Sequence, residues 1–154
     1  MDPIERLLAV RAIEDVIGRY CILFDDQDWD GLEALWTEDA AFVVDGDGFE
    51  GRATVLEFLR TCLPPDYRSK HLISPPVIDL ADDGRSARAR TDVAWIAQNF
   101  EVAIVARYDD ALSRGDDGVW RIRRRDEFAV PFEPGPPPMS GDAVRVSGAT
   151  MRPR

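Results

Sequence analysis

The chain has 154 residues, of which 45% are hydrophobic and 31% are charged, and it carries a formal net charge of −10 at pH 7. This length and composition are typical of one soluble globular domain that can bury a core of its own. The acidic balance argues against nucleic acid as a partner, because nucleic-acid binders present an excess of lysine and arginine to the phosphates.

The sequence shows no targeting or membrane signal. It contains no run of about 18 apolar residues, the length that a membrane-spanning helix requires, so no span is expected. The first residues, MDPIERLL, carry early acids and do not resemble a signal peptide. Cys21 and Cys62 stand in no motif and are expected to be free thiols in a reducing compartment. We therefore expect a cytoplasmic protein.

Residues 3–24 predict an amphipathic helix around which the rest of the chain is organised. Apolar side chains recur on one helical face, at steps of three and four residues: Ile13, Val16, Ile17, Tyr20 and Phe24. Asp25 stands where this apolar face ends. A carboxylate beside a hydrophobic wall needs a partner, because a buried charge without one is costly.

Two short helices and a hairpin are predicted next. A helix near residues 30–36 can be capped by Asp28 or Asp30. Residues 42–44 predict a short strand that ends in a turn of aspartates and glycines at 45–48. A third helix at about 53–63 is stopped by Pro64 and Pro65.

The second half of the chain predicts four long strands, at about 69–81, 86–99, 101–114 and 119–130. Helices followed by long strands indicate an α+β domain over residues 1–130, with the helices packed into a curled sheet. Residues 131–154 are rich in proline and glycine and predict an extended tail, with at most a short strand at 143–146.

The acidic turn at residues 26–31 begins like a calcium loop, with acids at its first, third and fifth positions and a glycine at the sixth. Thr37 stands at the twelfth position, where a calcium loop carries a glutamate. A helix–helix turn with solvated acids is therefore the better interpretation. One histidine and two distant cysteines make no zinc site, so no metal is predicted.

His71 is the chain's one histidine, and it is the side chain suited to base chemistry near neutral pH. A lone histidine is more often structural than catalytic, and this alternative stays open. If the first helix lies in the concave face of the sheet, the strand that begins near His71 passes close to Asp25. Asp25 could then lie within hydrogen-bond reach of the imidazole, at about 2.6–3.2 Å, and orient it. Both side chains would line one mostly apolar pocket, with Tyr20 beside the site.

The one dense basic run, in the last predicted strand, contains Arg121, Arg123, Arg124 and Arg125. These arginines can form a solvated strand face, or one of them can turn inward to hold a polar substrate group. Strict alternation from Trp120 would turn Arg124 inward, whereas a β-bulge would turn Arg125 inward.

In the order and spacing of these sequence features, the chain resembles the SnoaL-like branch of the nuclear transport factor 2-like superfamily. The resemblance rests on residues 12–42, on FEGR at 49–52, on His71 at the start of a strand, and on DGVWRIRRRDEF at 117–128. It implies a cone-shaped α+β barrel, in which a strongly bent sheet wraps helices around a deep pocket, and a homodimer or higher homo-oligomer.

Within this branch the chain most resembles scytalone dehydratase, bile-acid 7α-dehydratase and hexachlorocyclohexane dehydrochlorinase. The resemblance implies an Asp–His dyad that works without a cofactor, formed by Asp25 and His71, with Tyr20 at the position of the dehydratases' tyrosine. It maps the dehydrochlorinase's pocket arginine onto Arg125. No counterpart is found for the second histidine of scytalone dehydratase.

These observations lead to the hypothesis of a lyase that dehydrates a small apolar, cyclic hydroxycarbonyl substrate. We expect its pocket to be walled by aromatic side chains: Phe24, Phe42, Phe58, Trp95 and Trp36. An isomerase or polyketide cyclase with the same dyad is one alternative, and a binding domain without catalysis is another. The apolar run at residues 102–106 is expected to lie on the convex face of the sheet and to pair with a second copy.

Overall fold

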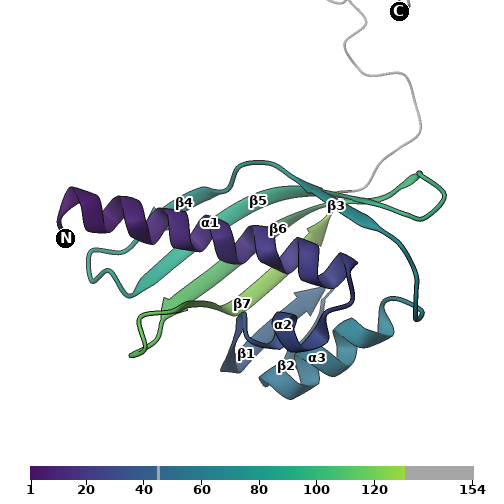
Figure 1. The fold of residues 1–154 in the computed structure, drawn as a ribbon, viewed down its shortest axis with the longest axis horizontal. Helices are drawn as coiled ribbons and strands as arrows, with labels where there is room; N and C mark the ends of the chain where they lie inside the picture. Colours follow the sequence, from purple (N-terminus) through teal and green to yellow (C-terminus); the bar gives the residue numbers. More distant parts are fainter. Residues whose placement is uncertain (45, 131–154) are drawn as a thin grey trace, which may run out of the picture.

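In residues 1–44 and 46–130, which the computed structural model describes, three helices pack against one face of a curved sheet of seven strands (Figure 1). The helices are α1 (Pro3–Asp25), α2 (Trp29–Glu33) and α3 (Arg52–Thr61). The strands are β1 (Trp36–Val44), β2 (Asp47–Glu50), β3 (Lys70–Ile73), β4 (Val77–Leu80), β5 (Ser86–Ile96), β6 (Val102–Arg114) and β7 (Trp120–Ala129). The predicted α+β class, with helices against a curved sheet, is confirmed.

The strands lie in the order β2-β1-β7-β6-β5-β3, and β4 also pairs with β5. β1 and β7 are parallel, whereas every other pair is antiparallel. The sheet is therefore mixed, and among the described residues it does not close on itself, because β2 and β3 remain at its edges. This topology puts β3, which carries His71, three strands away from β7.

Helix α1 lies across the sheet and packs against β3, β4 and β7 (Figure 1). Its start is marked by Pro3 in the first turn and by a capping box between Asp2 and Glu5. Its apolar face is buried as predicted, and Ile13 and Ile17 have no exposed surface. In the described part of the chain, no helix has both the length and the apolar character needed to span a membrane. The end of α1 places Asp25 beside the sheet.

Several predicted elements have different bounds in the structure, and the short strand predicted at 42–44 is longer, since β1 runs from Trp36 to Val44. The predicted helix at 30–36 ends at Glu33, and Trp36 instead begins β1, where it pairs with Ile122 of β7. The predicted strand at 69–81 is two strands, because Pro75 and Pro76 between them lack the N–H groups that a ladder requires. The tail predicted for residues 131–154 lies outside the described residues.

The face of the sheet away from the helices carries a row of apolar side chains. Leu72 of β3 is 58% exposed, Ala94 and Val105 continue its row across β5 and β6, and Phe128 of β7 is also 58% exposed. Only part of the run at 102–106 lies on this outer face, because Ile104 lines the cavity on the inner face and Ala106 is buried. Alternation along β6 explains this difference.

We propose that two copies of the chain pair through this outer face. An exposed apolar row is costly in water and is buried when a second copy packs against it. The Arg107–Asp92 ion pair on the same face carries both a positive and a negative charge, so each copy can pair its charges with those of the other. Sedimentation at micromolar concentration should give the mass of two chains, and Leu72→Glu should give the mass of one. Leu7→Glu, on the exposed side of α1, should not change the mass. A wild-type mass of one chain would contradict the proposal.

Candidate active site

Asp25 and His71 are 46 positions apart in the chain, and the structure brings them into direct contact. The Nδ1 atom of His71 lies 2.8 Å from Oδ1 of Asp25, which is the predicted hydrogen-bond distance. The backbone N–H of His71 donates to Oδ2 of Asp25 at 2.8 Å, and the Ser69 hydroxyl donates to Oδ1 at 3.1 Å. Three donors therefore hold one carboxylate at the junction of α1 and β3.

These donors decide the charge of Asp25. Burial alone would raise the pKa of Asp25, but the hydrogen bonds from His71 and Ser69 outweigh burial and lower it below its ordinary value. Asp25 is thus a carboxylate at neutral pH and can only accept hydrogen bonds, so the Nδ1 atom of His71 carries a proton and donates it to Oδ1. Nε2 is then the ring nitrogen that carries the free lone pair and can take a proton.

The lowered pKa of Asp25 predicts a pH dependence of stability. A carboxyl group with a lower pKa in the folded state stabilises the fold above its unfolded pKa of 3.8, and this stabilisation is lost as the pH falls through the folded value. Wild type should therefore lose more stability than Asp25→Asn as the pH falls below about 4. Urea unfolding of both proteins at pH 6 and at pH 3 measures this difference, and equal losses would contradict it.

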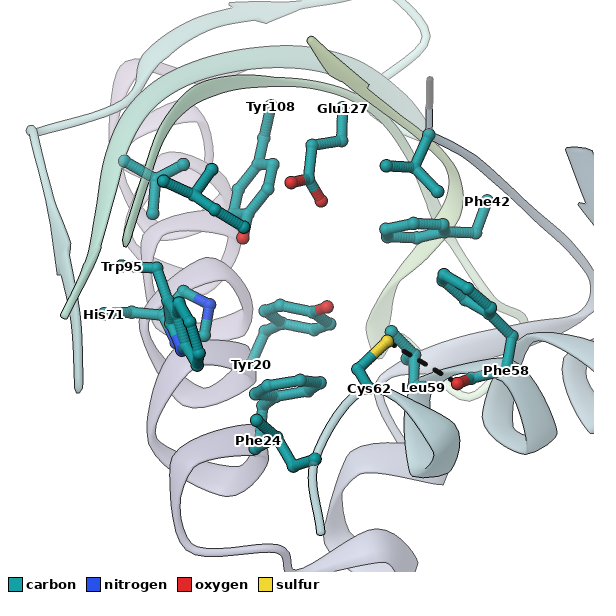
Figure 2. Close-up of a pocket in the computed structure, with 14 residues that line it drawn as sticks. Tyr20, Phe24, Phe42, Phe58, Leu59, Cys62, His71, Trp95, Tyr108 and Glu127 are labelled. Atoms are coloured by element: carbon teal, nitrogen blue, oxygen red, sulfur yellow. Dashed lines mark hydrogen bonds between the residues drawn. The ribbon is translucent and has the colours of Figure 1, made fainter. Parts of the chain in front are cut away.

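His71 lines a cavity of about 220 Å³ between the helices and the inner face of the sheet (Figure 2). The wall is mainly aromatic and aliphatic: Tyr20, Phe24, Phe42, Val44, Phe58, Leu59, Cys62, Leu63, Val93, Trp95, Ile104 and Tyr108, with Glu127. Four of the five predicted wall aromatics, Phe24, Phe42, Phe58 and Trp95, are in this set. Such a mostly apolar cavity with a few polar groups is typical of a small-molecule site.

Two predicted site residues lie behind the wall of this cavity. Trp36 has no exposed surface and packs its ring edge-on against Tyr20, with 6.0 Å between the centroids. Asp25 was expected to line the cavity together with His71, but it is not among the lining residues. A helix turns about 100° per residue, so Asp25 points away from the face that Phe24 shares with Tyr20. Asp25 can therefore act on a ligand only through His71.

Tyr20 presents its ring and hydroxyl to the cavity (Figure 2). Burial raises the pKa of Tyr20 far above its ordinary value, although the nearby Arg125 guanidinium partly opposes this effect. Burial likewise raises the pKa of Tyr108, on the neighbouring wall. Both hydroxyls therefore stay protonated at neutral pH and can donate hydrogen bonds to a ligand.

Arg125 turns inward, as the β-bulge alternative predicted, and Arg124 turns outward. Ala111 of β6 pairs with Arg124, but the next residue, Leu112, pairs with Ile122, so β7 carries one extra residue at this point. Arg125 has no exposed surface, whereas Arg124 forms an ion pair with Asp126 at the surface. The bulge therefore settles which arginine enters the interior.

The guanidinium of Arg125 lies beneath the tyrosines. Its Nε and Nη2 atoms donate to the two carboxylate oxygens of Asp110 at 2.7 and 2.8 Å. Its Cζ atom is 4.0 Å from the ring centroids of both Tyr20 and Tyr108. Arg125 is not among the cavity-lining residues, so the structure places it as a support for the two rings. A direct contact between Arg125 and substrate stays a prediction.

Four residues with polar side chains that line the cavity or contact Asp25 were not predicted as parts of the site: Ser69, Tyr108, Cys62 and Glu127. Tyr108 and Glu127 face each other across β6 and β7. The inward direction of Glu127 could be assigned only once the bulge in β7 was known, whereas alternation along β6 was the available signal for Tyr108. Ser69 precedes His71 by two residues, and this spacing was the available signal for its contact with Asp25.

The acidic turn at residues 26–31 has a structural role. The side chain of Asp28 accepts a hydrogen bond from the backbone N–H of Gly31 at 2.9 Å and caps α2. Within residues 1–44 and 46–130, no three side chains of histidine, cysteine, aspartate or glutamate are grouped so that they could hold a metal ion. Cys21 and Cys62 are free thiols.

Comparison with known proteins identifies relatives of this fold. The family profile of the SnoaL-like domain matches residues 5–126. A protein of unknown function from Mycobacterium tuberculosis superimposes with a TM-score of 0.75 at 25% identity, over 86% of this chain and 78% of that one. A search of curated protein sequences finds no match.

Two further solved structures are similar in fold. A candidate scytalone dehydratase from Novosphingobium aromaticivorans has a TM-score of 0.72 at 23% identity, over 82% of this chain and 87% of that one. A hexachlorocyclohexane dehydrochlorinase from Novosphingobium barchaimii has a TM-score of 0.73 at 20% identity, over 86% of this chain and 93% of that one. At these identities the likeness establishes the fold.

Proposed function

The chain belongs to the SnoaL-like branch of the nuclear transport factor 2-like superfamily, and from this premise we propose that it is a cofactor-independent lyase. Its substrate is a small, cyclic, mostly apolar hydroxycarbonyl compound, and its product is the unsaturated carbonyl compound together with water. The observation that carries the proposal is the contact between His71 and Asp25 at the wall of an apolar cavity.

In the proposed reaction, Nε2 of His71 takes a proton from the carbon beside the substrate's carbonyl group. The electron pair of the broken C–H bond forms a carbon–carbon double bond, and the C–O bond to the hydroxyl group on the next carbon breaks. The departing hydroxide takes up the proton that His71 removed, from Nε2 of the imidazolium, and leaves as water, so the imidazole is restored. Asp25 holds the Nδ1 proton and stabilises the imidazolium that forms.

Tyr20 supplies the polar contact that this reaction needs. Because its hydroxyl stays protonated, it can donate a hydrogen bond to the carbonyl oxygen, where negative charge develops, or to the leaving hydroxyl. The guanidinium of Arg125 lies against the ring of Tyr20 and helps to hold it in place. Phe24 packs edge-on against His71, with 5.3 Å between the centroids, and limits the imidazole's rotation.

The size of the cavity restricts the substrate. A volume of about 220 Å³ is below the range of roughly 300–1,000 Å³ that is usual for drug-sized ligands, so a compound of one or two rings fits best. Two structural neighbours are named for eliminations, which supports an elimination here. The name of the candidate scytalone dehydratase denotes loss of water, and that of the hexachlorocyclohexane dehydrochlorinase denotes loss of hydrogen chloride.

A panel of cyclic β-hydroxyketones tests the proposal, with 3-hydroxy-1-tetralone as its first member. Loss of water from this compound gives 1-naphthol, which is detected by its fluorescence. Wild type should form the dehydrated product, and His71→Ala should bind the compound without converting it.

The alternatives give different outcomes in the same assay. An isomerase or cyclase would return a product of unchanged mass, which mass spectrometry detects. If wild type binds members of the panel but converts none, and His71→Ala binds them equally well, the lyase proposal fails and a binding domain remains.

A further inference from the structure

Two donors share one oxygen of the Asp25 carboxylate. Its Oδ1 atom accepts the Nδ1–H of His71 at 2.8 Å and the hydroxyl of Ser69 at 3.1 Å, while Oδ2 accepts the backbone N–H of His71. The side chains of Asp25 and His71 are buried, and Ser69 is only 5% exposed. A hydrogen bond in such surroundings is electrostatically stronger than one in water. The Ser69 hydroxyl therefore acts directly on the oxygen that holds the imidazole.

The start of β3 brings the hydroxyl and the imidazole to the same carboxylate. Side chains two residues apart on an extended chain point to the same side, so Ser69, directly before β3, and His71, within it, both face the end of α1. Residue 70 between them points the opposite way, and its side chain is 65% exposed. The two donors thus reach Asp25 as one unit of the backbone.

The charged groups near Asp25 are on its solvent side. Asp26, Arg68 and Lys70 are exposed, and they line a surface hollow together with Asp25. The Nζ atom of Lys70 is 4.0 Å from Oδ2 of Asp25 and 3.7 Å from Oδ1 of Asp26. Ion pairs of exposed side chains contribute little, so the buried hydroxyl of Ser69 is the stronger influence on the carboxylate.

The side chains that pack on the dyad from α1 and β5 carry no charge at neutral pH. Tyr20 and Phe24 lie edge-on to His71, with 6.4 and 5.3 Å between the centroids, and Trp95 pairs with His71 in the β3–β5 ladder. Burial raises the pKa of Tyr20 far above its ordinary value and raises the pKa of Cys21 to about 11, so both stay protonated. These neighbours leave the hydrogen bonds to Asp25 as the main control on the dyad.

We propose that Ser69 is a positioning residue that sets the proton affinity of the Asp25–His71 dyad: its hydroxyl occupies Oδ1 and weakens the hold of the carboxylate on the imidazolium. A carboxylate that already accepts one donor attracts a further proton less strongly. The weaker hold favours the neutral imidazole, whose Nε2 can accept the substrate's proton, and it lets the imidazolium return that proton to the departing hydroxide. This inference rests on the proposed function, because it states how the base of the lyase is tuned.

NMR titration of the chain's one histidine tests the inference in the full chain without any substrate. The imidazole signals report the pH at which the dyad is half protonated. In Ser69→Ala this midpoint should lie about 0.5–1 pH unit higher than in wild type, because the net contribution of one hydrogen bond is of that size. The acidic limb of the pH profile of kcat/KM should move in the same direction by the same amount.

Two further variants at the same position separate the hydroxyl from its shape. Ser69→Thr keeps the hydroxyl and should keep the wild-type midpoint. Ser69→Cys has a weaker donor, so its midpoint should move upward by less than that of Ser69→Ala. Thermal unfolding shows whether each variant is folded, and Ser69→Cys decides the matter if Ser69→Ala does not fold.

Ser74→Ala is the matched control, because it removes a hydroxyl just beyond the other end of β3. The Ser74 hydroxyl accepts the backbone N–H of Asp92 at 3.1 Å and belongs to a different hydrogen bond. This control should keep the wild-type midpoint. The inference is overturned if folded Ser69→Ala titrates as wild type does, if Ser69→Thr shifts as far as Ser69→Ala, or if Ser74→Ala shifts equally.

Failure of the inference and failure of the proposed function are distinguishable. A midpoint that depends on Ser69 in a protein that dehydrates nothing would support the inference and reject the lyase. Dehydration that depends on His71, with the same midpoint in wild type and in Ser69→Ala, would support the lyase and reject the inference.

Discussion

Asp25→Asn should lower the turnover of the first cyclic β-hydroxyketone that wild type dehydrates by about 10³- to 10⁴-fold, the scale seen when a buried aspartate partner of a catalytic histidine is replaced. The amide of asparagine can donate to Nδ1 of His71, at the position where the carboxylate now accepts at 2.8 Å. The imidazole proton would then sit on Nε2, which could no longer take a proton from substrate. The variant should still bind the compound, since Asp25 does not line the cavity.

The neighbouring residue provides the control. Asp26→Asn removes the same charge one residue away, where the side chain is 62% exposed and 3.7 Å from the Nζ atom of Lys70. It should keep turnover within a few-fold of wild type, because exposed ion pairs contribute little. A loss of turnover in Asp25→Asn that is no larger than the loss in Asp26→Asn would contradict the role proposed for Asp25.

A second readout does not depend on knowing the substrate. The chain has one histidine, so the imidazole nitrogen signals in its NMR spectrum belong to His71 without further assignment. Wild type should show a proton on Nδ1, and Asp25→Asn should show it on Nε2. If both proteins show the same tautomer, the loss of turnover needs another explanation.

The sequence predicted α1 well, because this helix rests on a strong local pattern. The period of apolar residues over 3–24 indicates a helix whichever fold surrounds it, and Asp25 follows directly from where that face ends. The contact of Asp25 with His71 came from the resemblance to a family and from the expected packing of α1 against the sheet. It could not be derived from spacing alone, because 46 positions separate the two residues.

The errors arise where long-range pairing overrides a short local pattern. Leu32, Leu35 and Trp36 have helical spacing, but this pattern covers little more than one turn, and pairing with Ile122 places Trp36 at the start of β1. On β7, one extra residue between Ile122 and Arg124 reverses which side chains face inward. No sequence pattern sets that extra residue, and so Glu127 was not predicted as part of the site.

The ion pair of Arg125 with Asp110 lies beneath the site, and both residues have no exposed surface. Burial by itself would lower the pKa of Arg125, but the carboxylate of Asp110 outweighs this effect and raises it, so the guanidinium stays charged. Removal of one partner from such a pair leaves an uncompensated buried charge, whereas removal of both charges does not. A single substitution in the pair should therefore lower the free energy of unfolding more than a double substitution that removes both charges.

Asp110→Asn should lower the free energy of unfolding by about 3–5 kcal/mol, because it leaves the charge of Arg125 buried without its counter-ion. With a slope of about 2 kcal/mol per molar, the midpoint of urea unfolding should fall by roughly 2 M. The double variant with Asp110→Asn and Arg125→Met should recover part of this loss, since neither charge remains. Asp15→Asn, which breaks the exposed pair with Arg19 on α1, should unfold almost as wild type does.

The same variants separate stability from the site. Arg125 contacts the rings of Tyr20 and Tyr108, so the double variant should fold yet turn over substrate more slowly than wild type, because Tyr20 loses the group that holds its ring. A double variant less stable than Asp110→Asn would show that the arginine stabilises the fold through ring packing and not through its charge. Urea unfolding and initial rates on the same preparations decide between these outcomes.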